Sequence, residues 1–273
     1  MNIFARFFAW IRSLFVHTIS GAALGLVVHE DTAGDLAQLH ALGRPNRLPL
    51  VRTTNYGDPE SASRILTLSG YDYPLLVVVP FGKGYGPVGP GMTLQIDNEP
   101  DVQSPAVSPE QYGQTFRSTM QAMRQTLPSS IPIVTAGFSN SASEDWIHRA
   151  LVAGAADADA ICFHVYGDDL VQAFTARLAT VTAAMAAAGC TKPLWITEVG
   201  YSAASASPSR NPTAQAAQLK ALLALPALRA VARVYIYALA TDEISDYYGI
   251  CVHDLSRTPR PAFAVVQSAM GRS

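Results

Sequence analysis

The sequence is poor in cysteine and in charge. Its 273 residues contain three cysteines, Cys162, Cys190 and Cys251, and no C-x-x-C motif. This spacing argues against a zinc cage, a redox dithiol and a disulfide framework. Charged residues make up 15% of the chain, whereas a globular domain has about a quarter. We therefore expect much of the chain to be buried in a large core.

An excess of charge of one sign is also missing. The 19 basic and 21 acidic residues give a formal net charge of -2. Nucleic-acid binding and a polybasic membrane contact both need a cluster of positive charge, so we predict no nucleic-acid partner. No run approaches the roughly 18 consecutive apolar residues of a membrane-spanning helix.

Residues 1–17 read MNIFARFFAWIRSLFVH and have apolar side chains at helical spacing. They predict an amphipathic N-terminal helix over residues 1–20, separate from a domain over residues 21–273. Arg12 interrupts the apolar run that a cleavable signal peptide needs. We favour a helix that packs on the domain over its alternatives, a helix in a membrane interface and a poor signal sequence.

After Ser20, short apolar runs alternate with segments of helical pattern. Because the runs are apolar almost throughout, they predict parallel strands that are covered on both faces. The predicted strands are 23–29, 48–54, 73–80, 92–98, 131–138, 160–166, 193–199 and 231–239. The predicted helices are 32–42, 58–69, 109–127, 144–155, 170–188, 213–225 and 259–270. Eight such units without a break in composition favour a single-domain (β/α)8 barrel of the α/β class, with a doubly wound open sheet as the alternative.

One unit departs from this alternation. The third and fourth predicted strands are joined by FGKGYGPVGPGM, which is rich in Gly and Pro, both poor helix formers. We expect the third helix to be reduced or missing. The resulting loop would lie beside the active face of the barrel.

Polar side chains stand at the carboxyl ends of five predicted strands, where a barrel enzyme carries its catalytic groups. They are His29 on the first strand, Arg52 on the second, Asn98 and Glu99 on the fourth, His164 and Tyr166 on the sixth, and Glu198 on the seventh. Each has a structural explanation: Glu99 as a solvated or helix-capping acid, His164 as a core histidine, Arg52 as an ion-pair partner of Glu198. Glu198 is hardest to explain this way, because a charge inside an apolar strand costs free energy unless it is paired.

The two glutamates face each other across the mouth of the predicted ring. Glycosidic bond cleavage needs such a pair, with one carboxyl group protonated and the other ionised. Arg52 near Glu198 would favour the anion, and a less polar environment would keep Glu99 neutral.

These residues resemble clan A of the glycoside hydrolases. The resemblance rests on Asn-Glu-Pro at residues 98–100, His-x-Tyr at residues 164–166 and W-I-T-E-x-G at residues 195–200, and it covers the chain from about Gly21 onwards. It implies a retaining β-glycosidase that acts on a β-linked poly- or oligosaccharide through a covalent intermediate, with its carboxyl groups about 5 Å apart. It implies no cofactor and no metal.

The resemblance also implies roles for individual residues. Glu99 would be the acid/base and Glu198 the nucleophile, with Tyr166 and Arg52 holding Glu198 in place. Asn98 would bind the sugar 2-hydroxyl, while His164 and His29 would line the sugar site.

The sequence departs from the family at the end of the eighth strand, where many members carry a Trp under the sugar. Tyr235, Tyr237, Tyr247 and Tyr248 are the aromatic candidates here, and we select Tyr237. The loop after the third strand and the tyrosines after the eighth suggest an open groove and hence endo-action. The substrate class is compatible with an extracytoplasmic location, but the sequence shows no clear cleavable signal peptide and leaves the location open. The alternatives are an inactive carbohydrate-binding barrel and a barrel enzyme of another hydrolase class.

Overall fold

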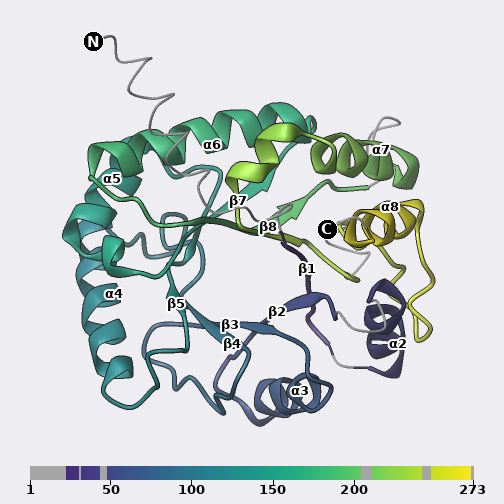
Figure 1. Ribbon diagram of the computed structural model, residues 1–273, viewed down its shortest axis with the longest axis horizontal. Coiled ribbons are helices and arrows are strands. Elements are labelled where there is room, and N and C mark those ends of the chain that lie inside the picture. The colour runs from purple at the N-terminus through teal and green to yellow at the C-terminus, as the bar shows by residue number, and fades with distance from the viewer. Residues whose placement is uncertain (1–22, 31, 44–47, 204–210, 242–246, 272–273) are drawn as a thin grey trace.

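A computed structural model describes residues 23–30, 32–43, 48–203, 211–241 and 247–271. Parallel strands form an inner ring that is surrounded by helices (Figure 1). The strands are β1 (Ala23–Val27), β2 (Leu50–Thr54), β3 (Leu75–Val79), β4 (Met92–Ile96), β5 (Ile133–Val134), β6 (Gly137–Phe138), β7 (Ile161–Tyr166), β8 (Leu194–Gly200) and β9 (Arg233–Ile236). The helices are α2 (Ala33–Leu42), α3 (Pro59–Gly70), α4 (Pro109–Arg124), α5 (Glu144–Ala153), α6 (Leu170–Ala187), α7 (Pro212–Leu223) and α8 (Pro261–Met270), with 3-10 turns η1 (Ala155–Asp157) and η2 (Pro226–Ala230).

The ring has eight strand positions, because β5 and β6 are two halves of one chain segment. The strand order is β5-β4-β3-β2-β1-β9-β8-β7-β6. β5 pairs with β4, whereas β6 pairs with β7, so the segment from Ile133 to Phe138 closes the ring from both sides. The predicted (β/α)8 barrel is therefore confirmed, and the fifth predicted strand is interrupted at Thr135 and Ala136.

The third connection contains no helix. Residues 80–91, all of which the structure describes, join β3 to β4 through turns and extended chain. The two strands nevertheless pair in parallel, from Leu75 with Met92 to Val79 with Ile96. The prediction that Gly and Pro would remove the third helix is confirmed.

The helices begin at residues that suit a helix N-terminus. A side-chain oxygen accepts a hydrogen bond from the third helical N–H in six of them, at Thr32, Asp58, Ser108, Ser143, Asp169 and Asn211. Such caps satisfy N–H groups that the helix itself leaves unpaired. In α3, α4 and α7 a proline follows the cap, where its fixed φ suits the first turn.

The apolar core has two layers, as the alternation of side chains along a strand requires. One layer joins the outer face of the strands to the helices and includes Phe116, Phe163 and Ile196. A smaller cluster, which includes Cys162, Trp195 and Tyr235, fills the ring. The ring is therefore packed with side chains along its axis.

Helix α6 is 18 residues long with a mean hydropathy of 1.3, which meets the length and composition of a membrane span. In the ring it lies between α5 and α7 (Figure 1), and Phe174, Val181 and Met185 on it are buried. The apolar composition of α6 is thus explained by its packing in the outer layer of the barrel. The predicted N-terminal helix, residues 1–20, lies outside the described residues.

Candidate active site

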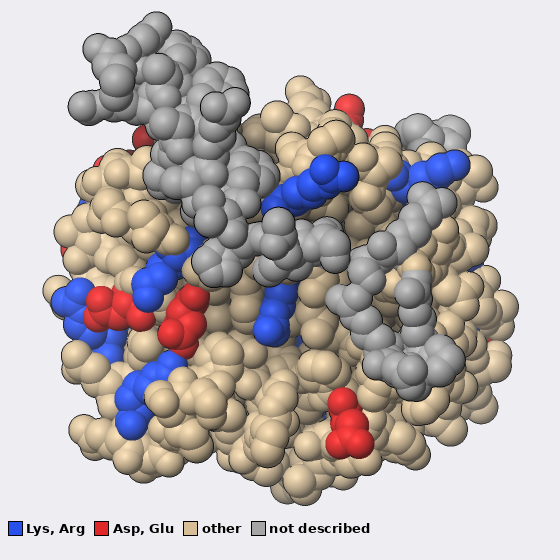
Figure 2. Space-filling view, in the orientation of Figure 1, with Lys and Arg blue, Asp and Glu red and all other residues tan. Residues whose placement is uncertain are grey.

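The predicted site residues lie together at the carboxyl ends of the strands. Charged side chains of both signs are scattered over the face seen in Figure 2, with broad uncharged areas between them. Within the ring, by contrast, ionisable groups are concentrated, because Arg52, Glu99, His164 and Glu198 all lie within one network of short contacts.

Glu99 stands on a turn that directly follows β4. Asp97 and Glu99 have φ angles of 69° and 46°, a left-handed conformation that is uncommon for residues other than glycine. The backbone N–H of Glu99 donates to the carbonyl of Gly137 on the neighbouring strand segment. Such conformations occur where the surrounding structure enforces them, often at functional sites.

Glu198 is directed into the site by an irregularity in β8. Ile196 and Val199 both belong to the outer, helix-facing core layer, so strict alternation fails between them. The register of β8 against both neighbours shifts here, and His164 pairs with Glu198. Bulges of this kind redirect side chains next to active sites, and here the shift places Glu198 beside His164.

Arg52 connects the nucleophile candidate to the end of β4. Its guanidinium donates to Glu198 Oε1 at 2.7 Å, to Asn98 Oδ1 at 2.7 Å and to Gln95 Oε1 at 3.2 Å. Gln95 also donates to Asn98 Oδ1 and to the carbonyl of Asp97. Because Asn98 Oδ1 is engaged, its amide nitrogen is the group left to donate to a ligand.

Sequence reasoning missed Gln95. It is fully buried on β4, in the run MTLQI. The criterion that selects Glu198, a polar group inside an apolar strand, also selects Gln95.

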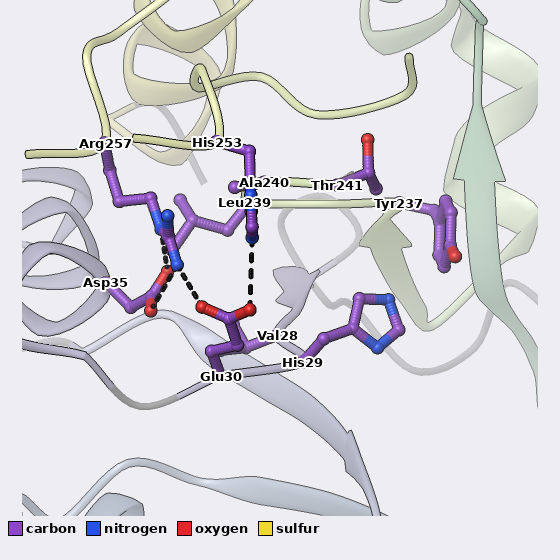
Figure 3. Close-up of a pocket in the computed structure, with 10 residues that line it drawn as sticks. All are labelled: Val28, His29, Glu30, Asp35, Tyr237, Leu239, Ala240, Thr241, His253 and Arg257. Atoms are coloured by element: carbon purple, nitrogen blue, oxygen red, sulfur yellow. Dashed lines mark hydrogen bonds and ion pairs between the residues drawn. The ribbon is translucent and has the colours of Figure 1, made fainter. Parts of the chain in front are cut away.

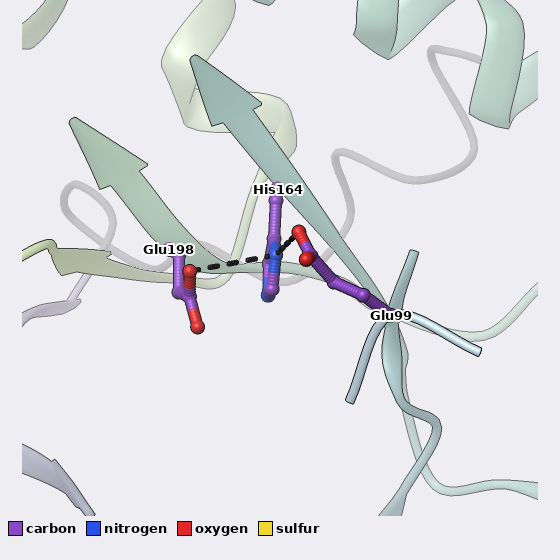
Figure 4. A group of neighbouring side chains, drawn as sticks. All are labelled: Glu99, His164 and Glu198. Atoms are coloured by element: carbon purple, nitrogen blue, oxygen red, sulfur yellow. Dashed lines mark hydrogen bonds and ion pairs between the residues drawn. The ribbon is translucent and has the colours of Figure 1, made fainter. Parts of the chain in front are cut away.

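His164 lies between the two glutamates (Figure 4). Its Nδ1 atom is 2.7 Å from Glu99 Oε1 and 3.6 Å from Glu198 Oε2. One carboxylate oxygen of each glutamate and the His164 nitrogen all lie within 4.8 Å of one another. Retaining glycosidases place their two carboxyl groups about 5–5.5 Å apart and inverting ones about 6.5–9.5 Å apart, so this separation suits retention.

The surroundings of Glu198 favour its ionised form. Burial, the largest single influence, raises the pKa of its carboxyl group. Electrostatic attraction from His164 and Arg52 and hydrogen bonds from Tyr166 and Arg52 outweigh burial and hold this pKa below its ordinary value. Burial also raises the pKa of Tyr166 well above its ordinary value, so the phenol keeps its proton and donates to Glu198.

The environment of Glu99 differs from the one expected. The sequence predicts the less polar environment for Glu99, yet its side chain is 31% exposed and that of Glu198 only 10%. Glu99 is more exposed because it stands on the turn after its strand, whereas Glu198 lies within β8. The less polar of the two environments is therefore that of Glu198, the reverse of what the sequence predicts.

Aromatic rings form one side of the site. Tyr237 contacts Tyr166, Tyr248 and His29, with ring centroids 5.9, 5.8 and 5.4 Å apart. Burial, followed by the charge of Arg52, lowers the pKa of His29, which leaves it neutral at pH 7. His29 and Tyr237 therefore lie on the side of the site that carries Tyr166 and Glu198.

Glu99, His164 and Glu198 also offer one atom each to a metal ion. The charge of Arg52, which bonds Glu198 at 2.7 Å, would oppose a divalent cation there. His164 Nδ1 is engaged by Glu99 at 2.7 Å. The donor set therefore fits a pair of acid/base carboxyl groups better than a metal centre.

The packing behind His164 leaves no room for a side chain at residue 137. A Cβ atom on Gly137 would lie 2.0 Å from His164 Nε2 and 2.6 Å from Thr197 Oγ1. Both polar atoms are buried and have no hydrogen-bond partner within the described residues. Gly137 thus allows His164 to occupy the position from which it contacts Glu99.

We expect Gly137→Ala to destabilise the protein by about 1–3 kcal/mol, because overpacking forces the surrounding side chains to shift. The free energy of unfolding, measured by urea denaturation, tests this. Gly70→Ala is the matched control, because a Cβ there meets no atom within 4 Å. Equal stability of the two variants would contradict the close packing of His164 against β6.

Comparisons with known proteins place this chain in a family. Residues 92–254, more than half of the chain, match the glycosyl hydrolase catalytic core. A search of curated proteins finds no significant match.

Solved structures with a similar fold include three glycan-related proteins. A mutant of Saccharomyces cerevisiae Gas2p in complex with laminaritetraose and laminaripentaose is 12% identical, has a TM-score of 0.59, and the match covers 90% of this chain and 62% of that chain. A family 39 glycoside hydrolase from Bacteroides cellulosilyticus WH2 is 15% identical and has a TM-score of 0.64, and the match covers 92% of this chain and 64% of that chain. AbfB, a family 51 alpha-L-arabinofuranosidase from Bifidobacterium longum, is 15% identical and has a TM-score of 0.60, and the match covers 96% of this chain and 65% of that chain.

At these identities the solved structures establish the fold alone, and this chain spans less than two thirds of the length of each. The family match covers the strand end that carries Glu99 as well as the strand that carries Glu198. The resemblance to glycoside hydrolases found in the sequence is therefore confirmed, and the chain belongs to the glycosyl hydrolase catalytic core family.

Proposed function

We propose that the protein is a retaining β-glycosidase, with Glu99 as acid/base and Glu198 as nucleophile. The observation that carries the proposal is the separation of the two carboxyl groups, which approach within 4.8 Å. This distance leaves room for one sugar ring between them and none for an attacking water on the opposite face.

In the first step, Glu99 transfers its proton to the glycosidic oxygen. The Glu198 carboxylate attacks the anomeric carbon, the bond to the leaving oxygen breaks, and the leaving group departs as an alcohol. A covalent glycosyl ester on Glu198 forms. The pKa of Glu198, held below its ordinary value, supplies the anion that this attack requires.

In the second step, the Glu99 carboxylate takes a proton from water. The water oxygen attacks the anomeric carbon, and the ester bond to Glu198 breaks. Two inversions at the same carbon give a product with the original configuration. Glu99 regains its proton and Glu198 its charge, so the cycle is closed.

Three side chains support these steps. Arg52 and Tyr166 donate hydrogen bonds to Glu198 and stabilise it as a carboxylate and as a leaving group. The amide nitrogen of Asn98 is oriented by Arg52 and is suited to donate to the sugar 2-hydroxyl. Hydrogen bonds at that hydroxyl strengthen in the transition state of such reactions.

The substrate proposed is a β-linked poly- or oligosaccharide that is cleaved internally. The loop over residues 80–91 lacks a covering helix, and Tyr237 and Tyr248 offer aromatic faces beside the site. Gas2p, whose fold is similar, was solved in complex with laminaritetraose and laminaripentaose, so β-glucans belong in the first set of substrates tested.

A substrate screen followed by NMR tests the proposal. Wild type is incubated with 4-nitrophenyl β-glycosides and with a polysaccharide panel that includes laminarin, and anomeric proton signals are followed from the start of cleavage. We expect the β-anomer to appear first and the α-anomer later by mutarotation. First appearance of the α-anomer, or a rate unchanged in both Glu99→Gln and Glu198→Gln, would contradict the proposal. An inactive carbohydrate-binding barrel would bind the panel without cleaving it.

We expect kcat/KM to hold its plateau to lower pH than an ordinary glutamate would allow. Protonation of Glu198 removes the nucleophile, and its pKa lies below the ordinary value, which is about 4.3. The lowered pKa of Glu198 also stabilises the folded protein at pH values above the ordinary pKa of a glutamate. This stabilisation is lost as the pH falls through the pKa that Glu198 has in the folded protein. The pH profile of kcat/KM from pH 3 to 7 measures the first effect, and melting temperatures over the same range measure the second.

Gln95→Leu tests whether the network around Arg52 sets this limit. Loss of the Gln95 oxygen leaves Arg52 Nε without this acceptor and loosens Arg52. We therefore expect the acidic limit, the pH below which kcat/KM falls, to move to higher pH. Gln121→Leu, at an exposed glutamine of α4, is the matched control and should leave the profile unchanged. A wild-type acidic limit at or above about 4.3 would contradict the assigned direction.

A further inference from the structure

A short loop lies between the turn that carries Glu99 and the strand end that supports Glu198. It covers residues 139–143, between β6 and the start of α5. The β5–β6 segment pairs with β4 on one side and with β7 on the other. Glu99 follows β4, and β7 ends at Tyr166, which donates to Glu198. The loop is therefore in a position to contact both halves of the catalytic machinery.

Asp101 connects this loop to the turn that carries Glu99. Its carboxylate accepts hydrogen bonds from the backbone N–H of Ser139 at 3.0 Å and from the Ser139 hydroxyl. The N–H of Glu99 donates to the carbonyl of Gly137, in the same segment, at 3.1 Å. The left-handed φ of Glu99 needs contacts of this kind, because an isolated chain disfavours it. Asp101 therefore supports the conformation in which Glu99 reaches His164.

Asn140 connects the same loop to the end of β7. Its side-chain oxygen accepts from the backbone N–H of Tyr166 at 3.2 Å, and its side-chain nitrogen donates to the carbonyl of Tyr166. The backbone of β6 pairs with β7 only as far as Phe138, so the amide of Asn140 extends this pairing to Tyr166. The phenol of Tyr166 is thereby held where it donates to Glu198.

The loop is also held from the helix layer. Arg177 on α6 is 5% exposed, and its guanidinium donates to the carbonyls of Phe138 and Ala142, on either side of Ser139 and Asn140. Burial lowers the pKa of Arg177 to about 10, so it remains a cation at pH 7. With both of its ends fixed, the loop cannot easily shift to compensate for the loss of a contact to either neighbour.

We propose that this loop, through Asp101 and Asn140, fixes the separation of the two catalytic carboxyl groups. Asp101 acts on Glu99, whereas Asn140 acts on Glu198 by way of Tyr166. Both are positioning residues, because each acts through another side chain. The inference rests on the proposed function and adds two residues to it. Such residues can matter greatly, since a displacement of about 1 Å in a reacting group can cost about 10²-fold in rate.

Asp101→Ala and Asp101→Asn test the contact to the Glu99 turn. Both variants remove the charge of Asp101, but the amide can still bond the N–H and hydroxyl of Ser139, whereas a methyl group cannot. The measurement is kcat/KM over aryl β-glycosides whose leaving groups differ in pKa. We expect Asp101→Ala to lose about ten- to a hundredfold with the poorest leaving group and little with 2,4-dinitrophenolate, which departs without the proton of Glu99. Asp101→Asn should stay within about threefold of wild type, because its hydrogen bonds survive.

Asn140→Ala tests the contact to Tyr166. Without the amide, Tyr166 is held less firmly and its hydrogen bond to Glu198 is weakened. We therefore expect the acidic limit of kcat/KM to move up by about half to one pH unit. The dependence on the leaving group should remain that of wild type, because Glu99 keeps its contacts. Asp101→Ala should show the reverse pattern, with an unchanged acidic limit. Gln114→Ala, at an exposed residue of α4, is the matched control for loss of an amide.

A loop contact on another side of the ring provides a second control. Arg257 binds Asp35 at 2.8 Å and also binds Glu30, which His253 contacts at 3.1 Å (Figure 3). These bonds join the segment after β9 to the start of α2, whereas the loop over residues 139–143 lies beside β4 and β7. Glu30→Gln weakens them. It should leave both the leaving-group dependence and the acidic limit as in wild type.

The two readouts separate positioning from damage to the fold. A loss of stability lowers kcat/KM for all substrates alike and leaves the acidic limit in place. Equal losses in Asp101→Ala and Asp101→Asn, a loss in Asp101→Ala that is the same for all leaving groups, or an unmoved acidic limit in Asn140→Ala would overturn this inference alone. Rates that are unchanged in both Glu99→Gln and Glu198→Gln would overturn the proposed function and this inference with it.

Discussion

Glu198→Gln is expected to lower kcat by about 10⁴-fold or more, the largest loss of any single substitution in this protein. The amide keeps the size of the side chain but cannot form the glycosyl ester. Arg52 Nη1, which bonds Glu198 Oε1 at 2.7 Å, can still donate to the amide oxygen, so the site should keep its shape. The rate with the best 4-nitrophenyl β-glycoside measures the effect, and circular dichroism checks the fold.

Azide distinguishes loss of the nucleophile from general damage. In Glu198→Ala, azide can enter the space that the carboxylate leaves and attack the anomeric carbon directly, which gives an α-glycosyl azide. Glu144→Gln, at an exposed glutamate of α5, is the matched control and should keep wild-type activity. A Glu198→Gln variant with more than a tenth of wild-type activity would contradict the assignment of the nucleophile.

Glu99→Gln is expected to lower kcat/KM by about 10²–10⁴-fold on substrates whose leaving group needs a proton. The size of the loss should depend on the leaving group, because a 2,4-dinitrophenolate departs without protonation. We therefore expect cleavage of a dinitrophenyl glycoside to be affected least in its first step and an unactivated oligosaccharide most. A series of aryl glycosides with leaving groups of different pKa measures this dependence.

Azide tests the second role of Glu99. In Glu99→Ala the glycosyl ester forms from the dinitrophenyl substrate. Its hydrolysis is slow, because no base takes the proton from the attacking water. Azide needs no base, so it should restore turnover and give a β-glycosyl azide, the opposite anomer to that expected from Glu198→Ala. A loss in Glu99→Gln that is the same for all leaving groups would contradict the acid/base role.

The order of the elements could be predicted from the sequence because each has a local cause. Apolar runs such as that of β3 mark strands buried on both faces, and residues such as Asp58 mark the starts of helices. The missing third helix follows from Gly and Pro alone. The break between β5 and β6 has no such local signal, because it depends on which half pairs with β4 and which with β7.

The site could be predicted as a set of residues but not as a network. Strand ends indicated Glu99, Glu198 and Arg52, since parallel strands bring their carboxyl ends to one edge. The environment of each depends on packing: Glu198 is directed inward by a register shift, and Glu99 is more exposed than expected. The contact between His253 and Glu30 joins residues from the two ends of the chain, and no sequence pattern relates them.

Trapping of the glycosyl-enzyme tests the central claim most directly. A 2-deoxy-2-fluoro glycoside with a dinitrophenolate leaving group slows both steps through its fluorine, while the leaving group keeps the first step fast enough for the ester to accumulate. Mass spectrometry of the intact protein and of its peptides locates the sugar. We predict that one fluorosugar is added per chain, on the peptide that contains Glu198, and that none is added to Glu198→Gln. A fluorosugar attached to another residue, or the absence of any adduct while the dinitrophenyl substrate is still cleaved, would contradict the account.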